Sequence, residues 1–327
     1  MVRNKRKTRA TLPAGMESGD LGASKWSLGP PSGSFTKYQP ERGRMQQQLM
    51  LPDTLYPDAR PFSNGTHGTI FLATGEAGEK LILKRLAKNG AGKQRIRNEI
   101  EAGIRLRGIP QVPFFHRHME TEEHTWLIFD FVDGVDLLTW MEDFNFEPVE
   151  EHTVRQIALQ IIHTLDHVHS RGISHKDIKL ENLILDTTTG LISILDFGLC
   201  YSFSKGKDHL CKDFAGSREY SPPELLLTYG PFSATKADVW SLGVTLYALL
   251  YGCFPFGFDT KTAEEMISSG RHPSPTFPED VVVSSDAVDL LSKMIEVDPD
   301  KRLDLRQIVL HPWFDELCGP EEPSASP

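Results

Sequence analysis

The chain contains little cysteine: Cys200, Cys211, Cys253 and Cys318 are the only four among 327 residues. They include no CxxC pair and no regular spacing, so neither a thiolate zinc site nor a secreted disulfide framework is indicated. The basic residues 3–9 are not followed by the apolar core that a signal peptide has after its basic start. We therefore expect a reducing compartment, cytoplasmic or nuclear, and no secretion.

Only one long run lacks charge, from Val239 to Phe258, and it approaches the length that crosses a bilayer. Ser241, Gly243 and Pro255 interrupt its apolarity, and helices that are apolar all round also occur at the centre of large soluble domains. We predict a buried helix here. A membrane span is the alternative interpretation.

Basic residues are in deficit, with 35 Lys and Arg against 45 Asp and Glu and a net charge of −10. The first 50 residues carry nine basic and three acidic side chains, so residues 51–327 carry a net −16. An acidic body favours a basic peptide over nucleic acid, whose phosphates it would repel. The alternative is that the acidity serves only solubility.

Both ends of the chain have the composition of unfolded segments. Residues 1–50 are rich in Gly, Ser, Pro, Arg and Gln and cannot bury enough surface to offset chain entropy, so we predict a disordered basic tail. Its basic cluster is either a nuclear-import signal or simply solvated. Residues 317–327 are predicted to form a second disordered tail.

The region between the tails changes from strand to helix patterns. Short apolar runs predict antiparallel strands; they are residues 69–73, 80–84 and 126–129. Ile96, Ile100 and Ile104 recur with the spacing of one amphipathic helix. After Gly134 the pattern is helical. We predict an α+β fold with a small sheet lobe, about 51–131, that includes one key helix, and a larger, mainly helical lobe, about 132–316.

The most informative stretch is Ser174 to Leu183, followed by Asp-Phe-Gly at 196–198. Asp177 can accept a hydroxyl proton and Lys179 can neutralise a transferring phosphoryl group. Asn182 and Asp196 offer the oxygen ligands that Mg²⁺ prefers. Alone, each aspartate could be a structural turn carboxylate, but together this spacing indicates phosphoryl transfer.

This pattern resembles the eukaryotic protein kinase family, serine/threonine type, and the resemblance covers roughly residues 55–316 in the family's motif order. The further matches are Ser63 to Ile70 (the glycine-rich loop), Ile82 to Lys84, Glu99, Pro222 to Glu224, Asp238 to Gly243, Lys301 with Arg302, and His311 to Phe314. Residues 216–220 and 238–244 are similar to the calcium/calmodulin-dependent-kinase-like group. The resemblance implies a bilobal kinase domain over residues 51–316 that uses ATP and Mg²⁺, and we expect a monomer.

By the resemblance, the nucleotide site comprises Ser63, Gly65, Gly68, Ile70, Lys84, Asp130, Val132 and Asp136. Glycine backbone can approach phosphate oxygens closely. However, Ser63 stands where the family has its first glycine, and a plain β-turn is the alternative for this loop. Adenine would bond the backbone of Asp130 and Val132, with Phe129 at the back of the pocket.

The resemblance assigns catalytic roles to Lys84, Glu99, Asp177 and Lys179. Glu99 is expected to pair with Lys84. Glu101 lies about 200° around the helix from Glu99 and would face away from Lys84. The alternative for Glu99 is an exposed acidic residue. Gly103 departs from the family, which usually places a large apolar side chain there. We expect this departure to loosen the helix, so that activity depends on a partner or substrate.

The activation segment also departs from the family, because Lys176 and Asp213 replace an arginine and a phosphothreonine. We predict that the two form a pair that keeps the loop ordered without phosphorylation, as aspartate carries a fixed charge. Two unrelated solvated charges are the alternative. Ser217 is expected to bond the catalytic aspartate. Glu224 and Arg302 are expected to form a buried structural pair.

Substrate choice is the last expectation. Asp136 and Glu181 match family positions that receive a substrate arginine, which carboxylates bind bidentately. Thr8 lies in the basic run of the tail and is a candidate for autophosphorylation. A pseudokinase scaffold is the rival, favoured by Ser63, Lys176 and Gly103. A small-molecule kinase of related fold is disfavoured by the peptide-docking run at 216–224.

Overall fold

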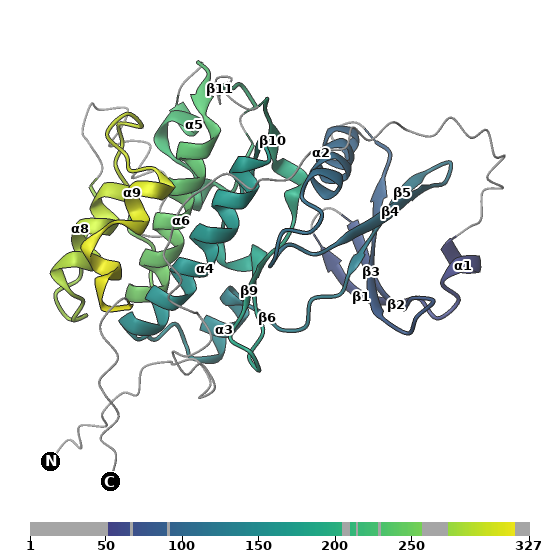
Figure 1. Ribbon diagram of the computed structural model, residues 1–327, viewed down its shortest axis with the longest axis horizontal. Coiled ribbons are helices and arrows are strands. Elements are labelled where there is room, and N and C mark those ends of the chain that lie inside the picture. The colour runs from purple at the N-terminus through teal and green to yellow at the C-terminus, as the bar shows by residue number, and fades with distance from the viewer. Residues whose placement is uncertain are drawn as a thin grey trace, which may run out of the picture.

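The computed structural model describes residues 52–65, 68–89, 92–204, 210–213, 215–227, 230–256 and 274–317. The predicted tail 1–50, with Thr8, and residues 318–327, with Cys318, lie outside the described residues. Leu317, predicted to begin the second tail, instead ends the 3₁₀ helix Pro312–Leu317. A small sheet lobe and a larger helical lobe lie side by side (Figure 1), which confirms the predicted α+β bilobal fold.

The small lobe is a five-stranded antiparallel sheet with the order β1-β2-β3-β5-β4. The strands are β1 (Arg60–Gly65), β2 (Gly68–Thr74), β3 (Lys80–Ala87), β4 (Phe115–Glu120) and β5 (His124–Asp130). Alternation along β3 buries Leu81 and Leu83 on one face. It therefore turns Ile82 and Lys84 towards the opposite face, which borders the other lobe.

One long helix, α2 (Gly92–Arg105), lies between this sheet and the helical lobe (Figure 1). Its Ile96 is buried as predicted, but Ile104 is 52% exposed, so the prediction that Ile104 shares the apolar face is wrong. Ile104 lies about 80° around the helix from Ile96, on the side away from the buried stripe that runs through Arg95, Glu99 and Ala102. Ala102, fully buried, lies on that stripe instead.

The large lobe is built mainly of helices (Figure 1). They are α3 (Leu137–Asp143), α4 (Glu151–Ser170), α5 (Pro223–Leu227), α6 (Ala234–Tyr251), α8 (Ser285–Met294) and α9 (Leu305–Val309). Three of its short strands form one sheet: β6 (Val135–Asp136), β8 (Leu183–Leu185) and β9 (Ile192–Ile194). Two further pairs are β7 (Ile173–Ser174) with β10 (Tyr201–Ser202), and β11 (Leu210–Cys211) with β12 (Phe232–Ser233). The main core cluster gathers the apolar faces of α4 and α6.

Helix α6 corresponds to the charge-free run, and it is buried on nearly every side. Its bounds differ from the prediction, because it begins before the run and ends at Tyr251. Gly252 stops the helix with a left-handed φ of +68°, where an added Cβ would clash with the Phe146 carbonyl. Within the described ranges, we find no helix that combines the length and apolarity needed to span a bilayer.

A buried carboxylate on α6 fixes the loop that follows β7. Asp238 accepts hydrogen bonds from the Ser174 hydroxyl (2.8 Å) and from the backbone N–H groups of His175 (2.9 Å) and Lys176 (2.6 Å). The His169 ring lies 2.8 Å from the same carboxylate. These bonds hold the loop that carries Asp177 rigidly against the core.

Candidate active site

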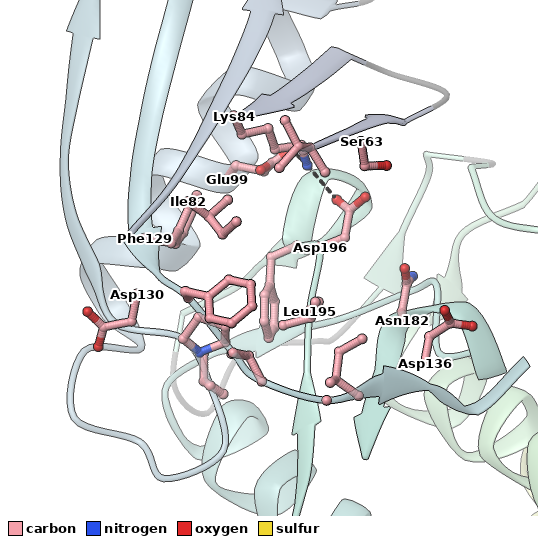
Figure 2. Close-up of a pocket in the computed structure, with 18 of the residues that line it drawn as sticks. Ser63, Ile82, Lys84, Glu99, Phe129, Asp130, Asp136, Asn182, Leu195 and Asp196 are labelled. Carbon is pink, nitrogen blue, oxygen red and sulfur yellow. Dashed lines mark hydrogen bonds and ion pairs between the residues drawn. The ribbon is translucent and has the colours of Figure 1, made fainter. Parts of the chain in front are cut away.

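A cavity of about 650 Å³ lies between the two lobes (Figure 2). Most of the predicted nucleotide and metal residues line it: Ser63, Gly68, Ile70, Lys84, Glu99, Asp130, Val132, Asp136, Asn182 and Asp196. Gly65 pairs with Gly68 at the end of the β1–β2 hairpin. Residues 66 and 67 of this hairpin lie outside the described part of the chain.

The rim of the cavity carries an aromatic pair that sequence reasoning missed. The rings of Phe62 and Phe131, two residues that line the cavity, meet edge to face with centroids 5.8 Å apart. Such rings can cover the flat face of a planar ligand. The signal available in the sequence was the position of Phe62 directly before Ser63 in the glycine-rich loop.

Residues 129–132, which lead from the end of β5 towards the large lobe, all line the cavity. The Asp130 carboxylate turns outward, where the His116 ring approaches it at 2.6 Å, and the Asp130 N–H donates to the Phe114 carbonyl. The Val132 N–H makes no backbone hydrogen bond to any described residue, so it can donate to a ligand. The expected contact through Asp130 is therefore restricted to its carbonyl.

Lys84 stands between two carboxylates. Its Nζ lies 2.7 Å from Glu99 and 3.2 Å from Asp196 (Figure 2). Burial acts to lower the pKa of Lys84, but the two anions outweigh it and raise the pKa, so the amine stays charged. Glu101 instead pairs with Arg105 at 3.1 Å on the exposed side of α2. The predicted choice of Glu99 over Glu101 matches this geometry.

Asp196 sits at a turn with φ +62°, directly before the 3₁₀ helix Phe197–Leu199. Besides Lys84, it receives a second cation that the sequence analysis missed: the Arg95 guanidinium, 2.8 Å away and also on α2. Burial works to raise the pKa of Asp196, but Lys84 and Arg95 hold it well below its usual range. Helical spacing gives only the position of Arg95 one turn before Glu99 on the same face, and not its contact with Asp196.

The space beside Gly103 is filled by Phe115 of β4, whose ring would lie 2.5 Å from a Cβ at that position. Two further contacts hold α2 to the large lobe. Asn98 donates to the Gly198 carbonyl at 3.1 Å, and Arg105 donates to the Phe203 carbonyl at 3.1 Å. The Phe115 ring therefore occupies the position of the missing side chain, and the predicted loosening of α2 stays a prediction.

The catalytic loop, residues 174–183, brings Asp177 and Lys179 together with Ser217, which lies about forty residues further along the chain. Lys179 Nζ lies 3.0 Å from the Asp177 carboxylate and donates to Ser217 Oγ at 2.8 Å. The Ser217 backbone N–H donates to Asp177 Oδ1 at 3.0 Å, so the expected serine contact is made by the amide rather than by the hydroxyl. Burial works to raise the pKa of Asp177, but Lys179 and Ser217 together outweigh it and the pKa is lowered. Asp177 is therefore ionised at neutral pH.

Asn182 links this loop to the cavity. Its amide nitrogen donates to the Asp177 backbone carbonyl at 2.8 Å, which leaves the amide oxygen as an acceptor. Asn182 and the ionised Asp196 line the same cavity and supply oxygen donors of the kind that Mg²⁺ takes. The donor set fits a metal–nucleotide complex, with the Lys84 ammonium beside it for the phosphates.

The predicted pair of Lys176 and Asp213 joins the catalytic loop to the activation segment. The Lys176 side chain is fully buried, has a φ of +65°, and donates to the Asp213 carbonyl (2.7 Å) and to its carboxylate (3.2 Å). Asp213 itself is 58% exposed. The two charges are thus not unrelated, although the carboxylate remains in contact with water.

Glu224 and Arg302 form a two-pronged pair at 2.7 and 3.0 Å, with the Arg302 side chain fully buried. Arg302 also donates to the carbonyls of Lys236 and Glu296, and its guanidinium lies over the Trp240 ring. The pair ties the helix that ends the activation segment to the core of the large lobe.

The two carboxylates expected to receive a substrate arginine are already engaged. Asp136 caps α3 by accepting from the Thr139 N–H (2.9 Å) and hydroxyl (2.8 Å), and Glu181 accepts from the Tyr220 hydroxyl at 3.3 Å. Both residues line the cavity. A carboxylate has more acceptor sites than these bonds use.

Comparison with known proteins agrees with this geometry. The family described as "Protein kinase domain" matches residues 56–314. Relatives include NUAK family SNF1-like kinase 2 of Rattus norvegicus (32% identical, covering 80% of this chain and 40% of the relative) and CBL-interacting serine/threonine-protein kinase 18 of Arabidopsis thaliana (31%, covering 82% and 53%). Maternal embryonic leucine zipper kinase of Xenopus tropicalis is 31% identical over 72% of this chain and 35% of its own length.

The matched part of the chain thus spans between 35% and 53% of the length of these three relatives. They confirm the predicted similarity to serine/threonine kinases of the calcium/calmodulin-dependent-kinase-like group. Since the family match covers most of the chain, the chain belongs to the protein kinase family.

Proposed function

We propose that this protein is an active, Mg²⁺- and ATP-dependent protein serine/threonine kinase. The observation that carries the proposal is the joint assembly of Lys84, Glu99 and Asp196 at one end of the cavity and of Asp177, Lys179 and Ser217 beside it. Family membership fixes the fold. The proposal for the chemistry rests on these six groups.

Each group has a distinct task in the proposed reaction. Asn182 and Asp196 would hold the metal ion, which would neutralise charge on the phosphates. Asp177, ionised and held by the Ser217 amide, accepts the proton of the substrate hydroxyl. Lys179 lies beside it and stabilises charge that develops on the transferring phosphoryl group.

The proposed substrate is a protein or peptide with basic residues near the acceptor hydroxyl. Asp136 and Glu181 line the same cavity, and the chain beyond the first 50 residues carries a net −16. Acidic surroundings steer cationic peptides and repel nucleic acid. The proposal takes the enzyme as a monomer of the cytoplasm or nucleus, with no nucleic-acid or membrane partner.

We further propose that the activation segment is competent without phosphorylation. The Lys176–Asp213 contact supports this, because a buried ammonium already has an anion where phosphorylation would supply one. The contact also includes the Asp213 carbonyl, a fixed acceptor that needs no modification. The filled space beside Gly103 removes one reason to require an activating partner.

The test is phosphate transfer from ATP by phosphatase-treated protein to paired peptides that differ only in an arginine upstream of the serine. Asp196→Asn, which removes the main proposed metal ligand, is the inactive control. Transfer by the wild type that is lost in the control, and that is faster for the arginine peptide, is the expected result. Nucleotide binding without transfer would instead support the rival pseudokinase scaffold, which the assembled catalytic groups disfavour.

A further inference from the structure

The Asp196 carboxylate contacts two cationic side chains, Lys84 and Arg95, and its proposed role requires only Lys84 nearby. Its Oδ1 accepts from Lys84 Nζ (3.2 Å) and from the Gly198 N–H (3.1 Å), while its Oδ2 accepts from the Arg95 guanidinium at 2.8 Å. Both carboxylate oxygens are therefore engaged. Arg95 is the contact that occupies Oδ2.

Arg95 is built into this place rather than resting on the surface. Only 8% of its surface is exposed, and its Nε lies 3.7 Å from Glu99 without a hydrogen-bond partner among the described residues. Gly198 packs directly beneath it, since an added Cβ there would lie 2.5 Å from Arg95 Nε. The guanidinium thus has a closely fitted pocket and one strong partner, Asp196.

A cation in this position has two consequences. It orients the Asp196 carboxylate by fixing Oδ2, and its permanent charge opposes any second cation that binds the same carboxylate. Arginine cannot give up its proton at accessible pH, so a metal ion must displace it or share the oxygen with it. Lys84, in contrast, has Glu99 as a second partner and stays neutralised when Asp196 turns to a metal.

We propose that Arg95 is a positioning residue that holds Asp196 Oδ2 until Mg²⁺ takes its place, and so raises the Mg²⁺ concentration that the nucleotide site needs. This inference rests on the proposed function, because it assumes that Asp196 is a metal ligand. It assigns to α2 a second role beyond Glu99: the helix sets the metal requirement of the site.

Arg95→Met tests the proposal, since methionine has an unbranched side chain that can fill the buried position but lacks the charge and the hydrogen-bond donors of the guanidinium. The measurement is a Mg²⁺ titration at a fixed, saturating concentration of a non-hydrolysable ATP analogue, followed by melting temperature, so that no turnover is needed. We expect the half-saturating Mg²⁺ concentration to fall roughly tenfold, the order set by repulsion between neighbouring charges in a partly buried site. Arg95→Lys, which keeps the charge, should stay near the wild-type value.

Arg97→Met is the matched control. Arg97 lies on the same helix, is exposed and donates to Gln94 at 3.0 Å, so the same charge change there should leave the Mg²⁺ requirement unaltered. In an Asp196→Asn background, Arg95→Met should no longer shift it, because the shared carboxylate is gone. Should Arg95→Met fail to fold, Arg95→Gln provides the same test of charge.

An Arg95→Met protein that needs as much Mg²⁺ as the wild type, or more, would overturn the proposal and leave Arg95 a structural clamp. Equal shifts in Arg95→Met and Arg95→Lys would overturn it as well, since packing and not charge would then be responsible. A wild type that binds no nucleotide at any Mg²⁺ concentration would refute the proposed function first and this inference with it.

Discussion

The ring of Phe115 occupies the volume that a side chain at position 103 would need: a Cβ on Gly103 would lie 2.5 Å from Phe115 Cγ and 2.8 Å from its Cβ. The two positions belong to different elements, α2 and β4. Phe115 is only 1% exposed, and its ring also meets the Phe129 ring with centroids 5.2 Å apart. The helix, the outer strand and the back of the cavity are therefore packed through one aromatic side chain.

This contact predicts a size exchange. Phe115→Ala should lower the free energy of unfolding by about 3–5 kcal/mol, the cost of an emptied aromatic site. Gly103→Leu alone should also destabilise the fold, because the ring cannot be accommodated. The double variant Gly103→Leu/Phe115→Ala should recover a substantial part of both losses. Chemical denaturation of the four proteins gives the coupling energy directly.

Control substitutions separate this contact from general damage. Ile104→Ala, one residue along α2 at a half-exposed position, should change stability by no more than about 0.5 kcal/mol. If the losses of the two single variants simply add in the double variant, Phe115 does not stand in for the side chain missing at 103.

The Lys176–Asp213 pair predicts an effect on activity rather than on stability. Because Asp213 is 58% exposed, Asp213→Ala should change the free energy of unfolding by only about 0–1 kcal/mol. It should lower kcat/KM for peptide by several-fold, since the segment that carries Ser217 loses an anchor. Steady-state kinetics of phosphatase-treated protein measure this. Asp298→Ala, which removes an exposed carboxylate from a pair with Lys301, is the control, and equal activity of Asp213→Ala and wild type would refute a role for the pair.

The Glu224–Arg302 pair, in contrast, predicts a large effect on stability. Glu224→Ala leaves a fully buried guanidinium without its anion and should cost about 3–5 kcal/mol of stability, measured by denaturation. Lys301→Ala removes a neighbouring charge that is 74% exposed and should be close to neutral. A Glu224→Ala protein as stable as the wild type would mean that water or another group compensates Arg302.

Local spacing in the sequence predicted much of the fold and of the candidate site. Strands such as β3 follow from alternation, which depends on neighbouring residues. The contacts among Asp177, Lys179 and Asn182 join residues that lie within five positions of one another in a single loop. The family resemblance favoured Glu99, and the helical angle between Glu99 and Glu101 adds that the two cannot both face Lys84.

Contacts between distant segments could not be predicted in this way. Arg95 meets Asp196 across a hundred residues of chain, and nothing in local spacing reports that distance. Phe115 fills the space beside Gly103 only because β4 packs against α2. The exposure of Ile104 also could not be predicted, because helical spacing alone does not say which side of α2 packs against the core.

Glu151, at the start of α4, predicts a pH dependence of stability. It accepts from the Ser284 N–H (2.9 Å) and hydroxyl (2.6 Å) and from the Trp313 indole at 2.8 Å, and it lies 3.2 Å from Arg155. Burial works to raise the pKa of Glu151, but the Ser284 and Trp313 hydrogen bonds and the Arg155 charge outweigh it and lower the pKa below its ordinary 4.5. The folded state therefore holds this proton more weakly than the unfolded chain does.

A lowered folded pKa gives stability that is fully present above pH 4.5 and is lost as the pH falls through the folded value. Glu151→Gln removes this titration. The wild type should therefore be the more stable protein at pH 7, and the difference should shrink as the pH falls below about 4.5, when measured by urea denaturation. Glu150→Gln, at the preceding position where the side chain makes no capping hydrogen bond, should follow the wild-type profile. A difference between wild type and Glu151→Gln that stays constant down to pH 3 would show that hydrogen-bond shape, and not the carboxylate charge, joins α4 to α8 and the terminal helix.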